Sequence, residues 1–299
     1  MPWYGPVFWP YAYFDLFYYP FWPYGYDDGY WFYAYDDFFD GVFWGELGSP
    51  ETYGYASRSE PRPRYATVQE LCNQPGTGVT AWPFAEIERK VGLSDEQKQL
   101  LGDVRKAAGD AAASFKASCP AENTFPLTPP GRLAAITARL DATLQAVQTV
   151  RPALEKFYDS LTDEQKERFN TIGPKKPGSS EARQALASAK SCKEQKPGLT
   201  NLPIERIEDA VKPTDAQQAS LKALEDATTK AVWILQAVCP DETPITPPGR
   251  LQAMETRLKA MVEAANTVKP ALEDFYGLLS AEQKARFNRI GQTLAQATE

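Results

Sequence analysis

The chain has 299 residues, 32 of them basic and 39 acidic, and a formal net charge of −7. Nine acids and three bases lie in residues 1–64, so the rest of the chain is close to neutral and offers no basic stripe for nucleic acid. The sequence contains no histidine and no phosphate-binding loop of the GxxxxGK[ST] type. We therefore expect a protein that is not an enzyme and has no catalytic residue, metal site or cofactor.

The chain begins with an aromatic segment, because residues 1–55 hold 25 of the 37 Phe, Trp and Tyr residues. Its prolines and aspartates oppose a membrane-spanning helix, and no signal peptide is visible after Met1. Three interpretations stay open: a low-complexity segment, an element that docks to a membrane interface or a partner protein, and a surface that stacks on cell-wall glycan. The candidate docking residues are Trp9, Tyr11, Trp22, Tyr24, Trp31 and Trp44.

An internal repeat organises the rest of the chain. Residues 128–173 align without gaps with residues 246–291, and the two segments are identical at 28 of 46 positions. This repeat predicts two homologous modules with a short linker rich in Pro and Gly between them. The expected domains are the extension 1–64, module 1 at 65–173, the linker 174–179, module 2 at 180–291 and the tail 292–299.

Apolar residues recur every three or four positions in both modules, which predicts an all-α fold. The longest stripe is Leu133, Ile136, Leu140, Leu144, Val147 and Val150, and module 2 repeats it as Leu251, Met254, Leu258, Met261, Ala265 and Val268. An earlier stripe is Leu101, Val104, Ala108, Ala111 and Phe115, with Leu221, Leu224, Ala231 and Leu235 in module 2. We interpret these stripes as core. Pro152 and Pro270 predict a kink or a break in the third helix of each module.

The four cysteines repeat with the modules. Cys72 and Cys119 are 47 residues apart, and Cys192 and Cys239 have the same spacing. Duplicated spacing favours the disulfides Cys72–Cys119 and Cys192–Cys239, which would staple each helical module. Each closed loop would contribute about 4 kcal/mol in the chain-entropy model. Structural disulfides imply an oxidising compartment, whereas the alternative is four buried free thiols.

Four helices are expected to begin with one capping motif, in which a Ser or Thr precedes a Gln by three residues. The hydroxyl accepts from the backbone N–H of the Gln, and the Gln side chain reaches back to the backbone of the capping residue. Four copies in register with the repeat make this a specific signal. The motif residues are Leu93, Ser94 and Gln97; Leu161, Thr162 and Gln165; Thr214 and Gln217; and Leu279, Ser280 and Gln283.

With this motif the chain resembles the LTxxQ-motif proteins of the Spy/CpxP type, which are helical periplasmic proteins of Gram-negative bacteria. Residues 161–165, LTDEQ, match the motif letter for letter. The resemblance covers both modules and omits the extension. It implies two cradle-like helical-hairpin modules, periplasmic localisation, frequent dimer formation, and action as an ATP-independent chaperone or envelope-stress modulator.

Two functional hypotheses follow. In the first, the protein holds non-native envelope proteins, which requires exposed apolar area rimmed by charge. In the second, it is a structural or interaction protein of the cell envelope that docks through its aromatic N-terminal segment.

Overall fold

The computed structural model describes most of both modules, and the described residues form eight α-helices and no strand. This part of the chain is therefore all-α, as the apolar periodicity predicts. The described residues are 83–117, 128–170, 172, 204–238 and 246–288. The extension, the linker 174–179, the tail 292–299, the six docking aromatics and all four cysteines lie outside them.

Within the described residues, each module contributes two long helices and two short ones. The helices of module 1 are α4 (Phe84–Val91), α5 (Asp95–Ala117), α6 (Pro129–Asp159) and α7 (Asp163–Asn170). Those of module 2 are α10 (Ile204–Val211), α11 (Asp215–Ala237), α12 (Pro247–Leu278) and α13 (Ala281–Asn288). The two modules thus repeat the same order of short, long, long and short helices.

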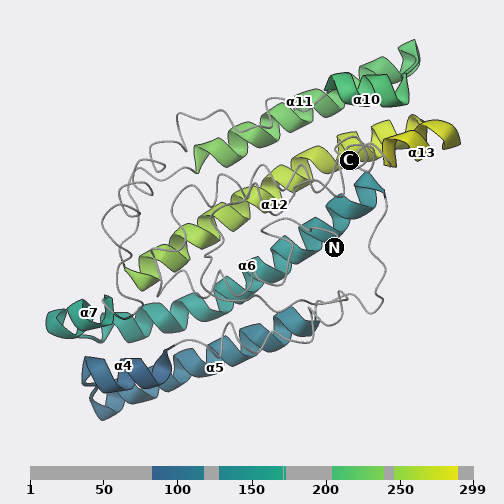
Figure 1. Ribbon diagram of the computed structural model, residues 1–299. Coiled ribbons are helices and arrows are strands. Elements are labelled where there is room, and N and C mark those ends of the chain that lie inside the picture. The colour runs from purple at the N-terminus through teal and green to yellow at the C-terminus, as the bar shows by residue number, and fades with distance from the viewer. Residues whose placement is uncertain (1–82, 118–127, 171, 173–203, 239–245, 289–299) are drawn as a thin grey trace, which may run out of the picture.

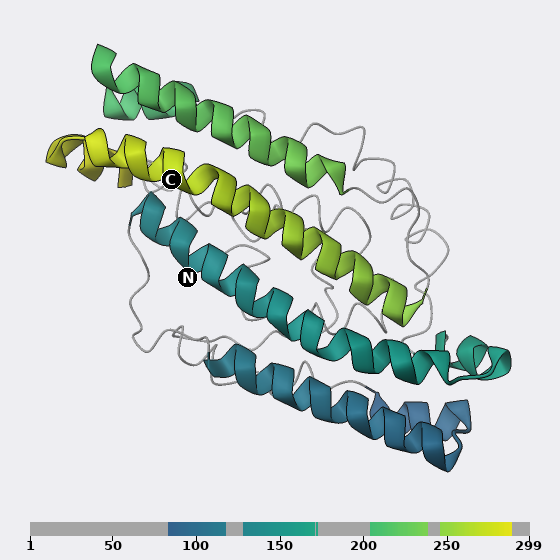
Figure 2. The same cartoon turned by 180° about the vertical axis from the view of Figure 1, so that it is seen from behind.

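The four long helices lie side by side in the order α5, α6, α12, α11, as both views show (Figures 1 and 2). In the centre, α6 of module 1 packs against α12 of module 2, and the two helices run in opposite directions. The short helices α4 and α7 pair at one end of the layer, and α10 and α13 pair at the other. The two modules are thus related by an approximate two-fold axis that passes between α6 and α12, perpendicular to the layer.

Most residues of the predicted stripes are buried, which confirms their interpretation as core. All of them are buried except Leu144, which is half-buried, and Phe115, whose side chain is not among those described. The buried apolar side chains of both modules belong to one cluster. Burial at about 25 cal/mol per Å² of apolar area makes this shared core the main stabilising contribution to the fold.

The two central helices begin with the same sequence, Thr-Pro-Pro-Gly-Arg. The hydroxyl of Thr128 accepts from the backbone N–H of Gly131 at 3.2 Å, and that of Thr246 accepts from Gly249 at 3.2 Å. In both helices the prolines occupy the first two positions, where the missing N–H costs no intrahelical bond. This segment is therefore a third kind of helix start in each repeat. It does not contain the S/T-x-x-Q motif, so that motif did not predict it.

The sequence predicts a kink or a break at the internal prolines, and neither helix breaks there. Helix α6 continues through Pro152, and α12 continues through Pro270. Both prolines lie on the exposed side of their helix. The carbonyl that loses its intrahelical donor therefore faces water, and packing of the opposite side holds the helix together on both sides of the proline.

Each central helix needs a second buried stripe, because it has a long helix on both sides. On α6 this stripe holds Arg132, Ala142 and Ala146, and the equivalent positions of α12 are Arg250, Ala260 and Ala264. Alanine side chains at these buried positions let a neighbouring helix approach closely. None of the described helices is long and apolar enough to span a membrane.

Candidate functional site

The four motif glutamines lie at the two ends of the layer, each in the first turn of a helix. Gln97 begins α5 and Gln165 begins α7, and in module 2 Gln217 begins α11 and Gln283 begins α13. All four side chains are buried, with 7 to 8% of their surface exposed. A buried amide must find partners for two donors and for the lone pairs of its oxygen, so these positions demand a network.

The first part of that network is the cap of each helix. Ser94 donates its backbone N–H to Oε1 of Gln97 at 2.9 Å, and Gln97 donates its own N–H to Oγ of Ser94 at 3.2 Å. The same two bonds measure 2.9 and 3.3 Å between Thr162 and Gln165. They measure 2.8 and 3.2 Å between Ser280 and Gln283. These are reciprocal capping boxes that satisfy two backbone donors each.

The fourth cap is at Thr214. Its backbone N–H donates to Oε1 of Gln217 at 2.9 Å, and its backbone carbonyl accepts from the N–H of Gln217 at 2.8 Å. The motif thus places all four glutamine side chains in the same orientation, with Oε1 turned back to the residue that precedes the helix.

The second part of the network joins glutamines that are far apart in sequence. Nε2 of Gln97 donates to Oε1 of Gln165 at 2.8 Å, and Nε2 of Gln165 donates back to Oε1 of Gln97 at 2.9 Å. The other hydrogen of each Nε2 goes to a backbone carbonyl, that of Ser160 at 2.8 Å or that of Gly92 at 2.8 Å. Each amide therefore uses both donors and accepts two hydrogen bonds, and its orientation is fixed.

Module 2 repeats this pair. Gln217 and Gln283 exchange amide hydrogen bonds at 3.0 and 2.9 Å. Nε2 of Gln217 also donates to the carbonyl of Leu278 at 2.8 Å, and Nε2 of Gln283 donates to the carbonyls of Val211 at 3.3 Å and Lys212 at 3.4 Å. We refer to Gln97 with Gln165, and to Gln217 with Gln283, as the glutamine pairs.

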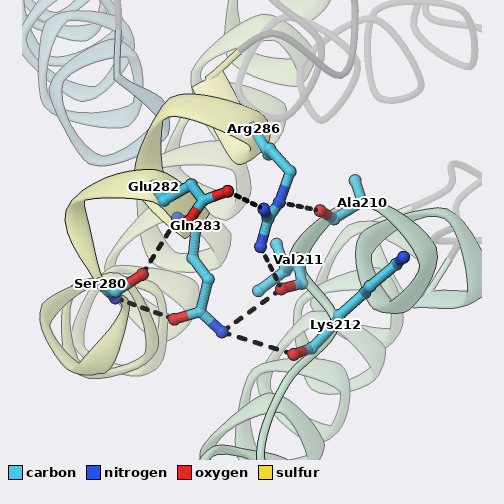
Figure 3. Close-up of polar contacts among 7 residues, drawn as sticks. All are labelled: Ala210, Val211, Lys212, Ser280, Glu282, Gln283 and Arg286. Atoms are coloured by element: carbon cyan, nitrogen blue, oxygen red, sulfur yellow. Dashed lines mark hydrogen bonds and ion pairs between the residues drawn. The ribbon is translucent and has the colours of Figure 1, made fainter.

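An arginine completes the contact between α13 and the end of α10 (Figure 3). Nε of Arg286 donates to the carbonyl of Ala210 at 2.8 Å, and its Nη2 donates to that of Val211 at 3.3 Å. Nη1 of the same side chain bonds Glu282 at 2.9 Å. The last carbonyls of α10 are thus covered by a cation and an amide from α13, which suits the negative end of the helix dipole.

The leucines of the motif belong to the core. The exposed fraction of the leucine side chain is 9% at Leu93, 4% at Leu161 and 4% at Leu279. In the fourth copy of the motif, Pro213 takes the place of the leucine and is half-buried. The leucine anchors the chain just before each cap while the glutamine joins two helix starts. The motif therefore has an apolar part and a polar part, and both hold the end of a module together.

Sequence reasoning did not single out an aromatic cluster beside each glutamine pair. In module 1 the rings of Phe157 and Phe169 meet edge to face at 5.6 Å, and the hydroxyl of Tyr158 bonds the side chain of Asn170. Module 2 repeats these contacts with Phe275, Phe287, Tyr276 and Asn288. The repeated letters FY and RFN were the signal, since both occur at equivalent positions of the two modules.

A second polar site lies between the modules and was also missed. Glu255 of α12 is 5% exposed and pairs with Nε of Arg151 on α6 at 2.6 Å. It also accepts from Lys259 at 2.6 Å and from Nε2 of Gln148 at 3.3 Å. Burial alone would raise the pKa of Glu255, but the hydrogen bonds from Lys259 and Gln148 and the charges of Arg151 and Lys259 outweigh it and hold that pKa below its usual value.

Arg132, at the start of α6, is a buried cation beside module 2. Burial lowers its pKa to about 10, and the interaction with Tyr276 of α12 opposes that shift. It stays charged at neutral pH. The contact places the start of α6 beside the end of α12, as the antiparallel packing requires.

This arrangement supports structure rather than chemistry at the motif. A primary amide with all its hydrogen bonds made has no proton to transfer at neutral pH and no free lone pair for a metal. Within the described ranges no group of three or more Cys, Asp or Glu side chains is placed to hold a metal ion. The candidate functional surface is therefore to be sought on the exposed sides of the helices.

Comparison with protein families gives one result that agrees with this geometry. The model described as "LTXXQ motif family protein" matches residues 79–173 and, again, residues 199–291. The last part of each matched range contains the second glutamine of a pair and the aromatic cluster beside it. The comparisons with curated proteins and with solved structures gave no match.

Proposed function

The chain belongs to the LTXXQ motif family, whose model matches both of its modules, and from this membership we propose that it is an ATP-independent chaperone or stress modulator of the cell envelope. In this proposal the protein acts in the periplasm and binds non-native envelope proteins. The observation that carries the proposal is that the motif residues hold the helices together. The exposed surface of the helix layer is therefore the part available to bind a client protein.

One part of that surface suits a client of varied sequence. The exposed sides of α6 and α12 lie on the same face of the layer, because the approximate two-fold axis is perpendicular to it. We define the central strip as Ala134, Ala138, Asp141, Gln145 and Gln148 of α6 with Gln252, Thr256, Lys259, Glu263 and Asn266 of α12, all exposed.

The central strip combines small and amide side chains with few charges. Among its ten residues only Asp141, Lys259 and Glu263 are charged. Alanine and the alkyl parts of glutamine and lysine offer apolar contact, while the amides bond any exposed backbone. Such a surface holds unfolded segments weakly and without sequence preference, as release without ATP requires.

The test is light scattering of a reduced or heat-denatured client. The protein is expected to suppress aggregation at several-fold molar excess. The double variant Ala138→Glu with Gln145→Glu adds two charges to the central strip and is expected to lose most of this suppression. The matched control is Ala113→Glu on the exposed side of α5, which should retain it. Failure of the unaltered protein to suppress aggregation would sink the proposal.

A second candidate rests on the composition of the extension, where 25 of the 37 aromatic residues fall within residues 1–55. In this candidate the protein is a structural or interaction protein that docks to the membrane interface or cell wall through that segment. Deletion of residues 1–64 distinguishes this candidate function from the chaperone function. Loss of membrane co-sedimentation with unchanged client protection favours docking, and no change in either property removes this second candidate.

A further inference from the structure

The side of α6 and α12 that lies opposite the central strip is buried. Its residues follow one line along each helix, because positions 7, 11 and 18 apart return to nearly the same side. Gln145 of the central strip is nine positions, or two and a half turns, from both Ile136 and Leu154, and so lies directly opposite them. We define the buried face as Ile136, Thr143, Val147 and Leu154 of α6 with Met254, Met261, Ala265 and Leu272 of α12, each at most 6% exposed.

The helices beside α6 and α12 do not account for this burial. α6 packs against α5 and α12, and α12 packs against α6 and α11, so the four long helices form one layer (Figures 1 and 2). The described short helices pair at the two ends of that layer, away from its middle. Such a layer leaves its two faces equally open. Since one face of the central helices is exposed and the other is buried, a further part of the chain is needed to cover the buried face.

Three arginines border the buried face. Arg132, Arg250 and Arg257 each precede a residue of this face by four positions, which places them one turn away on the same side of the helix. Their exposed fractions are 4, 2 and 2%. Buried guanidinium groups are stabilised by carboxylates and by the faces of aromatic rings. A segment that covers this face should therefore be both aromatic and acidic.

The aromatic extension has that composition and sufficient length. Residues 1–55 contain 25 aromatic residues and eight acidic residues, with no lysine or arginine. The 31 residues of α6 span about 46 Å, whereas 55 residues reach up to about 180 Å when extended. The described part of the chain begins at Pro83, just before α4 at one end of the layer. Residues 56–82 are therefore long enough to connect the extension to that end.

We propose that residues 1–55 bind the buried face of the same chain, with apolar contacts to its side chains and acidic contacts to the three arginines. A segment of the same chain has the advantage of high effective concentration over a client protein or a second copy. The inference does not rest on the chaperone proposal, which concerns the central strip on the other face. It also differs from the second candidate function, in which the aromatic residues bind the envelope.

The test uses the full chain with the photoreactive residue p-benzoylphenylalanine in place of Met261. Irradiation is expected to link this position to peptides from residues 1–55, identified by mass spectrometry, in a product with the mass of one chain. The matched control carries the same group in place of Gln252 on the central strip and should give at least ten-fold less of this link. Circular dichroism reports whether the helices persist. If they do not, the group replaces Thr143, the equivalent position of α6, instead.

A second variant tests the contribution of the acidic residues. Asp27→Asn, Asp28→Asn, Asp36→Asn and Asp37→Asn together remove four of the eight carboxylates of residues 1–55 and leave every aromatic ring in place. In the chain that carries the photoreactive group at Met261, these changes are expected to lower the yield of the link several-fold. An unchanged yield would overturn the acidic contacts to the arginines.

Three other results would overturn the proposal. The first is a link from the Met261 position only to peptides of the helices. The second is a link to residues 1–55 in a product with the mass of two chains, which would mean that a second copy supplies the covering segment. The third is an equal yield from the Met261 and Gln252 positions, which would mean that the extension does not distinguish the two faces of the layer.

Discussion

Gln97 and Gln165 bind each other through both ends of their amide groups, with Nε2 of each donating to Oε1 of the other at 2.8 and 2.9 Å. Each of these oxygens also accepts from the backbone N–H that its own helix start must satisfy. One side chain thus caps a helix and joins it to a second helix. This explains physically why the motif requires glutamine, since a carboxylate could accept at this position but could not donate.

In each glutamine pair, one amide binds the carbonyl of a left-handed residue that follows the preceding short helix. Gly92 has φ 71° after α4, and Lys212 has φ 50° after α10. A Cβ on Gly92 would meet no atom within 4 Å, so Gly92→Ala acts through backbone conformation alone. It is expected to cost about 1–2 kcal/mol in the free energy of unfolding. Urea denaturation measures this change in the free energy of unfolding.

The matched change is Lys212→Gly, at the equivalent position of module 2. It relieves the left-handed strain but increases the entropy of the unfolded chain, so the free energy of unfolding should change by less than about 0.5 kcal/mol. Equal losses of stability in Gly92→Ala and Lys212→Gly would contradict this explanation of the two turns.

The sequence predicted the family and the helices that carry the apolar stripes or begin with the capping motif, because these are local or repeated patterns. The spacing of Ser94 and Gln97 by three residues is such a pattern. That Gln97 meets Gln165 could not be predicted in the same way, since 68 residues separate them and capping chemistry is complete without the pairing. The residues of the aromatic clusters occur at equivalent positions of the two repeats. They have no regular spacing from which their contacts could be predicted.

Two other features depend on tertiary packing. Proline propensity predicted a kink or a break at Pro152 and Pro270. Neither helix breaks, because packing on the opposite side of a long helix outweighs the loss of one hydrogen bond. The pair of Arg151 and Glu255 lies between modules, and no local rule relates those positions. The predicted disulfides and the role of the aromatic extension remain predictions, because those residues lie outside the described ranges.

The tight packing of the buried alanines of α12 can be tested at Ala264, which is fully buried. Ala264→Leu inserts three carbons into a stripe of small residues and is expected to cost about 1–3 kcal/mol by overpacking. Ala138→Leu, on the exposed side of α6, is the control and should change stability by less than about 0.5 kcal/mol. Equal effects of the two substitutions would show that Ala264 is not packed as tightly as its burial indicates.

The buried carboxylate between the modules makes stability depend on pH. The pKa of Glu255 is lowered in the folded protein, from about 4.3 in an unfolded chain, so its contribution is present at neutral pH and is lost as pH falls through the folded pKa. Glu255→Gln is expected to be less stable at pH 7 by about 1–3 kcal/mol, and the difference should shrink below about pH 4.

The control for this pH series is Glu263→Gln, on the exposed side of the same helix. Its free energy of unfolding should stay within about 0.5 kcal/mol of the unaltered protein at about pH 7. Thermal or urea unfolding from about pH 3 to neutral pH is the measurement. A difference between Glu255→Gln and the unaltered protein that stays constant over this range would refute the role given to the carboxylate.

The measurement that tests the account most directly is a double-mutant cycle on one glutamine pair, with Gln97→Ala, Gln165→Ala and the double variant unfolded in urea. Each single change leaves the partner amide with unmet hydrogen bonds and is expected to cost about 2–3 kcal/mol. The double variant should cost less than the sum of the two single changes, by a coupling of about 1–2 kcal/mol. Costs that simply add would contradict the finding that the family motif works by pairing its glutamines.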